Sequence, residues 1–180
     1  ERKKVSLGDI IFASTPSKSH ARGVASILHR GLTADASLYL HPAESGKGMG
    51  EIKAVASGQL EFSISVIGLA PDTTEPGHTA FSHLGVNPID KAIKIIDALY
   101  QLNEARNSRI RHEKIHKEVG RSTNLHISNI VSNDEHRLSR LNETCTFGGA
   151  ISFPPGEDLS QVKEEIEKTV KKVSENDDWL

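Results

Sequence analysis

The sequence is poor in the residues that build disulfide-rich, aromatic-packed or polyanion-binding proteins. Aromatic residues make up 4% of its 180 positions, and it holds one cysteine, one tryptophan and one methionine. The single cysteine, Cys145, excludes an intrachain disulfide framework and fits a reducing compartment, so we expect a cytoplasmic protein. The 22 basic and 24 acidic side chains are interspersed, with a formal net charge of -2, which argues against nucleic acid as a partner. No apolar run approaches the roughly 18 residues that span a bilayer, so we expect no membrane partner.

The first part of the chain has the pattern of an α/β segment. Two short apolar runs, residues 8–15 and 36–42, enclose residues 19–31, whose apolar positions recur at helical spacing. This order predicts a βαβ unit of a parallel sheet. The glycine-rich residues 43–51 predict a boundary between a partial catalytic-type domain, 1–56, and a second domain, 57–180. Because the chain begins at Glu1 without a methionine, we interpret it as a segment of a longer protein.

From Gln59 onward the pattern predicts the order β-α-β-β-α. Residues 59–68 alternate apolar and polar side chains, and residues 124–131 and 144–153 are two further strands, with a possible bulge at the pair Gly148 and Gly149. One helix begins at Asn87 and Pro88, which are typical N-cap and first-turn residues. The fold class is therefore α+β, a ferredoxin-like two-layer domain whose last strand is absent or lies beyond the segment. The predicted buried helix positions are Ile89, Ala92, Ile93, Ile96, Leu99 and Tyr100, then Leu159, Val162, Ile166, Val170 and Val173.

The loop before that helix carries two histidines. Residues 77–88 read GHTAFSHLGVNP and resemble the GHxAxxHLxxNP motif of succinyl-diaminopimelate desuccinylases. These belong to a family of zinc-dependent amidohydrolases with acetylornithine deacetylases, aminoacylases and glutamate carboxypeptidases. Residues 145–157, CTFGGAISFPPGE, look like the end of the family's inserted dimerisation domain, or lid. The resemblance implies a homodimeric parent that hydrolyses an amide of a small N-acyl amino acid or peptide, with zinc, or cobalt or manganese, as cofactor.

The resemblance also assigns roles to individual residues. His78 falls on the loop histidine that, in this family, donates a hydrogen bond to the substrate carbonyl in the partner subunit's active site. His83 would be its bracing neighbour and a substrate contact. His41 falls on a metal-ligand position and is a possible zinc ligand. Arg140 is a candidate for binding the substrate.

Three parts of the sequence depart from the family pattern. Ser17, Lys18 and Ser19 stand where the family has the glutamate base and a bridging carboxylate, and a protonated lysine cannot ligate zinc. Ser139 replaces an asparagine, and Ser152 replaces an arginine that grips the substrate carboxylate; Arg137 or Arg140 could compensate. These 180 residues alone therefore cannot hold a two-zinc site, and we expect the segment alone to be inactive, with no metal bound. A non-catalytic relative that serves dimerisation or ligand binding is the alternative.

A competing motif lies at residues 112–116, HEKIH, which matches the H-E-x-x-H zinc signature of another protease class. That signature needs an amphipathic helix embedded in a core. The surrounding residues are charged on nearly every side, which favours a solvated helical segment over a metal site.

Overall fold

Residues 8–16, 21–38, 48, 50–51, 53–75, 77–132 and 138–180 are described in a computed structural model, in which the chain divides into the units Glu1–Ile52 and Lys53–Leu180. In the first unit the predicted helix is present as α1, Arg22–His29. The predicted strands are absent from residues 8–15 and 36–38, and residues 39–42 lie outside the described part. A strand needs a neighbour to accept and donate its backbone hydrogen bonds. No such neighbour exists among the described residues of this unit, and Ile10 and Phe12 are 84% and 86% exposed.

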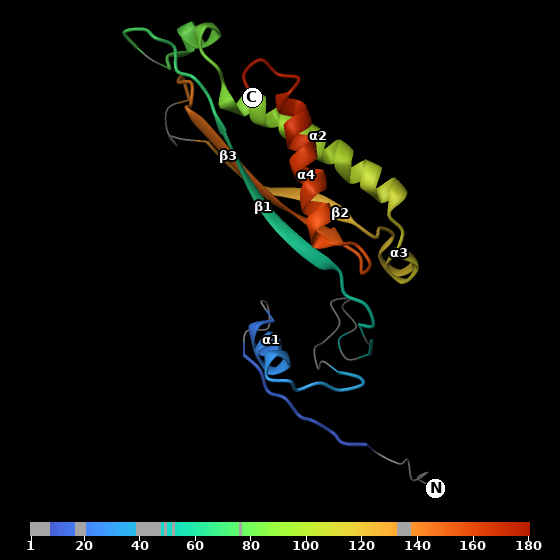
Figure 1. The fold of residues 1–180 in the computed structure, drawn as a ribbon. Helices are drawn as coiled ribbons and strands as arrows, with labels where there is room; N and C mark the ends of the chain where they lie inside the picture. The colour runs from blue at the N-terminus through green and yellow to red at the C-terminus, as the bar shows by residue number, and fades with distance from the viewer. Residues whose placement is uncertain are drawn as a thin grey trace. The chain divides into compact units, whose positions relative to one another are not determined.

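The second unit is a three-stranded antiparallel sheet covered by two long helices. Its strands are β1, Gly58–Ile67, β2, Asn124–Ser132, and β3, Thr144–Phe153, in the order β1-β3-β2. The helices α2, Pro88–Arg109, and α4, Leu159–Ser174, lie on one face of this sheet (Figure 1). A 3-10 helix, η2, Thr79–Leu84, precedes α2, and the short α3, Glu113–Val119, follows it. The ferredoxin-like α+β prediction is confirmed.

The core lies between the sheet and the two helices. Its buried apolar members come from all five long elements: Val66, Ala92, Ile95, Leu99, Leu125, Cys145, Phe147, Ile151, Val162 and Ile166. Two predicted core positions on α2 were wrong, because Ile93 and Tyr100 are 49% and 43% exposed while Ile95 is buried. The reason is that α4 packs along one flank of α2 and leaves the opposite flank uncovered. Leu159, predicted as buried, is also exposed at the first turn of α4.

The glycine pair of β3 lies opposite a bulge rather than forming one. The register of β2 against β3 shifts between Ile127 and Asn129, where β2 faces Gly148 and Gly149. A Cβ on Gly149 would lie 2.2 Å from the carbonyl oxygen of His126, whereas one on Gly148 would meet its nearest neighbour at 3.2 Å. The bulge predicted at these glycines is therefore present at this point of the sheet, but its extra residue belongs to β2 and not to β3.

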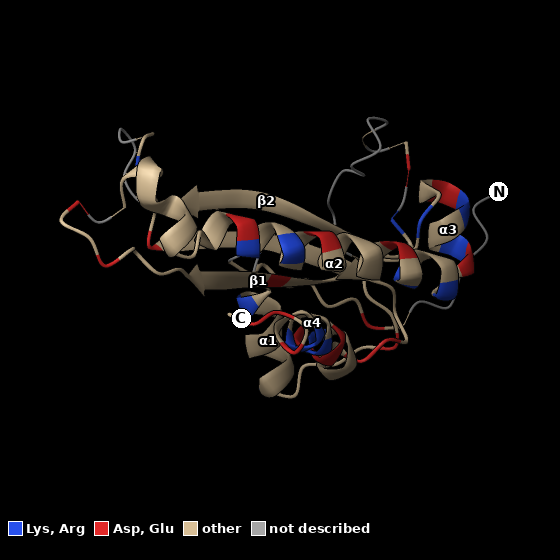
Figure 2. Ribbon diagram, turned by 90° about the horizontal axis from the view of Figure 1, so that it is seen from above, with Lys and Arg blue, Asp and Glu red and all other residues tan. Residues whose placement is uncertain are grey.

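A buried arginine ties α2 to α4 and β2. Arg106, whose side chain is 1% exposed, donates from Nη2 to both carboxylate oxygens of Glu157, at 3.0 and 2.7 Å, and from Nη1 to Glu165. Its Nε donates to Thr123 Oγ1 at 3.3 Å, and that hydroxyl donates to the carbonyl of Ser152 at 2.7 Å. Along α2, acidic and basic residues are interspersed (Figure 2).

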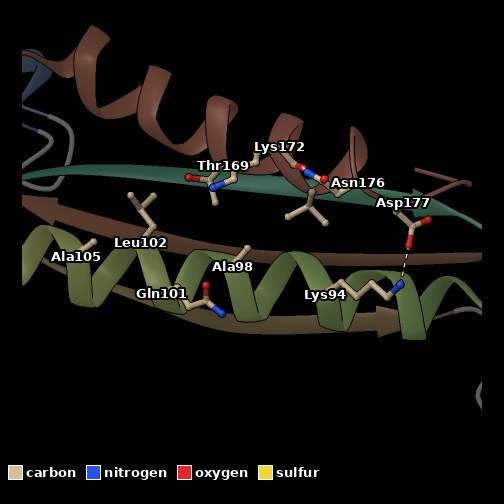
Figure 3. Close-up of a pocket in the computed structure, with 10 residues that line it drawn as sticks. Lys94, Ala98, Gln101, Leu102, Ala105, Thr169, Lys172, Asn176 and Asp177 are labelled. Carbon is tan, nitrogen blue, oxygen red and sulfur yellow. Dashed lines mark hydrogen bonds and ion pairs between the residues drawn. The ribbon is translucent and has the colours of Figure 1, made fainter.

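The C-terminal residues are held by an ion-pair cluster at the end of α4. Asp177, whose side chain is almost fully buried, accepts hydrogen bonds from Lys91 Nζ at 2.6 Å and Lys94 Nζ at 2.8 Å. These bonds hold the pKa of Asp177 well below its usual range. Trp179 Nε1 donates to the carbonyl of Ile67 at 2.8 Å, which fixes the tail to the end of β1. The Lys94–Asp177 pair closes one end of a hollow of about 500 Å³ between α2 and α4 (Figure 3).

Candidate functional site

The histidine loop connects β1 to α2 and is closed at its base. Leu69 and Val86 form an antiparallel bridge in which each backbone N–H donates to the other residue's carbonyl, at 3.0 and 2.8 Å. Asn87 then caps α2 by accepting from the N–H of Ile89 at 3.1 Å, as predicted. In Figure 1 the loop and η2 extend beyond the end of the sheet at which β3 begins. The base of the loop is thus fixed to both β1 and α2.

His78 stands at the N-terminus of η2 with its imidazole orientation fixed. Its Nδ1 accepts a hydrogen bond from the backbone N–H of Ala80 at 3.1 Å. The ring of Phe81 packs edge-on against the imidazole, with 6.3 Å between ring centroids and 62° between ring planes. Because Nδ1 is an acceptor, the neutral imidazole carries its proton on Nε2. The half-buried His78 is therefore preorganised as a hydrogen-bond donor through Nε2.

A second chain segment holds this histidine from the side. His78 and Arg140 form an antiparallel bridge. The flanking hydrogen bonds run from Thr79 N to Ser139 O, at 2.9 Å, and from Leu141 N to Gly77 O, at 2.5 Å. Gly77 has φ +80° and is buried, a conformation and a close approach that favour glycine. The structure thus brings together two predicted site residues that are far apart in the sequence.

The other predicted site residues have different outcomes. His83 lies in the last turn of η2, exposed, and five residues from His78. Because side chains three residues apart lie over each other in a 3-10 helix, the ring that packs on His78 is Phe81. A substrate contact by His83 stays a prediction. His41, Arg137 and the run Ser17–Ser19 lie outside the described residues.

The two serines at family site positions lie at opposite ends of β3. Ser139 accepts the N–H of Thr79 beside His78, whereas Ser152 pairs with Asn124 near the other end of the sheet. Eight residues separate Thr144 from Ser152, which at the rise of a strand is about 27 Å. The Ser152 hydroxyl donates to the carbonyl of Asn124 at 3.4 Å. The histidine loop and the Ser152 position are therefore far apart within one chain.

Residues 73–178, more than half of the chain, match the family model described as the peptidase dimerisation domain, M20_dimer. The chain belongs to this family. The recognition of a metallopeptidase-type dimerisation domain from the histidine loop is thereby confirmed.

The dimerisation domain is also similar to solved structures. One is assigned as an aminohydrolase from methicillin-resistant Staphylococcus aureus, at 18% identity and a TM-score of 0.46 over 68% of this chain and 27% of that one. Another is a hydantoinase/carbamoylase-family amidase from Burkholderia multivorans, at 12% identity and a TM-score of 0.45 over 67% of this chain and 25% of that one. A third is an M20-family metallo-carboxypeptidase from Sulfolobus solfataricus, at 14% identity and a TM-score of 0.43 over 67% of this chain and 41% of that one. The chain thus spans between a quarter and two-fifths of these structures. No curated protein matches it.

The competing HEKIH motif does not have the geometry of a zinc signature in this dimerisation domain. His112 is the N-cap residue of α3, with extended backbone angles, and its Nδ1 accepts from the N–H of Ile115 at 3.4 Å. Of the three residues that the zinc signature uses, Glu113 and His116 lie on the seven-residue helix and His112 does not. The two histidines are therefore not one turn apart on a helical face, which the signature requires.

The described residues form neither a metal-binding cluster nor a helix that could span a membrane. Among them, no group of three or more His, Cys, Asp or Glu side chains is placed to hold a metal ion. None of the described helices is long and apolar enough to cross a membrane. A metal ion of the full-length protein would have to be held by other residues.

Proposed function

We propose that the chain is the dimerisation domain, with part of the preceding domain, of a metal-dependent amidohydrolase acting on small N-acyl amino acids or peptides. In this proposal the homodimer brings the histidine loop of one subunit to the active site of the other. His78 then donates a hydrogen bond from Nε2 to the substrate carbonyl as negative charge develops on its oxygen. The observation that carries the proposal is the hydrogen bond from Ala80 N to His78 Nδ1, which leaves the proton on Nε2.

The rigidity of the loop supports this role. A donor stabilises developing charge best when it is already in place, because no reorganisation is then needed during the reaction. His78 is held by the Leu69–Val86 bridge, by the two hydrogen bonds to the Ser139–Leu141 segment, and by the edge of Phe81. A histidine with no role beyond solvation would not require all of these contacts.

The substrate role of His78 has a kinetic test in the full-length protein. Replacing it by alanine, His78→Ala, should lower kcat about 10²- to 10³-fold, the usual cost of one oxyanion donor. The KM should change little, because the donor acts mainly in the transition state. His116→Gln serves as the control for a histidine change on α3 and should leave kcat unchanged. An equal kcat in the His78→Ala protein and the wild type would overturn the role.

The dimer surface we propose is the outer edge of β2, with which no strand of the described residues pairs, together with the flank of α2 above it. This flank faces away from α4 and carries Ile93 and Tyr100, both substantially exposed. The β2 edge beside it exposes Ile130 and Val131. An unpaired strand edge with apolar neighbours favours pairing with a second chain.

Sedimentation equilibrium of the chain tests this surface. The wild type should be a dimer, and Tyr100→Glu should weaken association at least about tenfold, since a charge then has to be buried in the interface. Gln101→Glu adds the same charge on the next exposed position of α2, outside the proposed surface, and should not weaken it. A wild-type chain that is monomeric at all concentrations would refute the proposal.

A non-catalytic relative that keeps the dimer is the second candidate. The observation that favours it is Ser152, whose hydroxyl donates within the sheet and cannot replace the fork of an arginine on a carboxylate. The zinc, cobalt and manganese content of the full-length protein separates the two candidates. One or two metal ions per chain support the hydrolase, and a metal-free protein that still dimerises supports the relative.

A further inference from the structure

We propose that Asp177 and Trp179 are positioning residues for the histidine loop: they hold both ends of the loop and so keep His78 in its donating orientation. This deepens the proposed function and rests on it for the role of His78. The two residues follow α4 and are remote from the loop in sequence, since Trp179 and its partner Ile67 are 112 residues apart.

The end of β1, where the loop begins, is held by Trp179. Its indole Nε1 donates to the carbonyl of Ile67, the last residue of the strand, at 2.8 Å. The next residue, Gly68, donates its backbone N–H to the carbonyl of Glu143 at 2.7 Å. The bridge that closes the base of the loop begins one residue further on. The indole therefore fixes the point from which the loop departs.

The start of α2, where the loop ends, is held by Asp177. Its Oδ1 accepts from Lys91 Nζ at 2.6 Å, and its Oδ2 accepts from Lys94 Nζ at 2.8 Å (Figure 3). Both lysines lie in the first two turns of α2. Oδ1 also accepts the backbone N–H of Trp179 at 3.0 Å, so one carboxylate fixes both the helix and the residue that binds β1.

A short segment, residues 139–143, connects the base of the loop to the histidine. Its backbone hydrogen bonds to the loop are Gly68 N to Glu143 O, Leu141 N to Gly77 O, and Thr79 N to Ser139 O. Two of these bonds are made by the immediate neighbours of His78. A shift at the end of β1 would therefore move the backbone at His78 and weaken the bond from Ala80 N to its Nδ1, which places the proton on Nε2.

Amide hydrogen exchange of the 180-residue chain, followed by nuclear magnetic resonance, tests this coupling without relying on catalysis. Trp179→Phe keeps an aromatic ring and removes the indole N–H. We expect the Ala80 amide to exchange about three- to tenfold faster than in the wild type, which corresponds to the loss of one hydrogen bond. The amide of Val170, in the middle of α4, should keep its rate because the core is untouched.

A second variant and a matched control address the carboxylate. Asp177→Asn removes the charge that both lysines bind and should accelerate exchange at Ala80 in the same way. Asp178→Asn removes the same charge from the next residue, which is exposed, and should leave the exchange of Ala80 unchanged.

In the full-length protein the same coupling should separate kcat from KM. Trp179→Phe should lower kcat about three- to tenfold and leave KM nearly unchanged, because the loop supplies a transition-state contact. When it is added to His78→Ala it should lower kcat no further, since Trp179 acts through that histidine. A purely structural role would lower kcat by the same factor in both backgrounds, and that result would overturn the inference.

The exchange measurement keeps this inference distinct from the proposed function. An unchanged rate at Ala80 in Trp179→Phe overturns the inference, and so does equal acceleration at Ala80 and Val170, which would show a general loss of stability. Faster exchange at Ala80 alone supports the positioning role, even where a normal kcat in His78→Ala shows that the proposed function has failed.

Discussion

Removing Arg106 should strongly destabilise the second unit. Its guanidinium is almost fully buried and is shared by Glu157 and Glu165, with Thr123 as a third partner. Deleting one partner of a buried ion pair costs about 3–5 kcal/mol, because the remaining charges are left uncompensated. The two carboxylates are 21% and 30% exposed and can partly rehydrate. For Arg106→Met, which keeps the apolar stem, we therefore expect a loss of about 3 kcal/mol in the free energy of unfolding.

Urea unfolding followed by far-ultraviolet circular dichroism measures this loss, at one fixed protein concentration because association adds to apparent stability. Arg109→Met is the matched control: Arg109 also pairs with Glu165, but it is 58% exposed, so its loss should cost under about 1 kcal/mol. Arg106→Lys should be intermediate, since one ammonium cannot reproduce the fork. If Arg106→Met were no less stable than Arg109→Met, the network would contribute no more than a surface ion pair and the reasoning would be wrong.

The remaining predictions concern the tail and the sheet. Since the two lysines that bind Asp177 depress its pKa, the carboxylate of the folded chain stays ionised as the pH falls through the usual carboxyl range. Its contribution to stability is complete above that range and is lost as the pH falls below it, because the unfolded chain then takes up the proton. The fluorescence of Trp179, the only tryptophan, should therefore stay constant down to about pH 4 in the wild type and be shifted at neutral pH in Asp177→Asn; a wild-type transition near pH 4 would contradict this. In the sheet, Gly149→Ala should cost about 2 kcal/mol or more in urea unfolding because its Cβ meets a backbone carbonyl, while Gly148→Ala should cost less than about 1. Equal losses would show that β2 shifts to make room.

The fold was predictable where residues close together in the sequence decide the local conformation. Asn87 and Pro88 placed the start of α2 because capping is a local interaction, and the alternation in residues 59–68 placed β1 for the same reason. The buried face of α2 was less predictable. Which flank is covered depends on the position of α4, and the local sequence does not show whether Ile93 or Ile95 is the buried residue.

The candidate site was predictable in part for a similar reason. His78 was found because its loop motif is contiguous, whereas its pairing with Arg140 depends on a backbone bridge between segments about 60 residues apart. The buried position of Arg106 had no local signal, because an arginine in a helix ordinarily extends into solvent. Long-range pairing is the information that single-sequence reasoning lacks here.

The Leu69–Val86 bridge makes the histidine loop an exchangeable part of the molecule. Its two ends meet at one point on the sheet, so the number of residues between them does not set the distance from β1 to α2. The entropy of closing such a loop grows only slowly with its length. Insertions or replacements between the two bridge residues can therefore alter what the loop recognises while β1, α2 and the core beneath them keep their places.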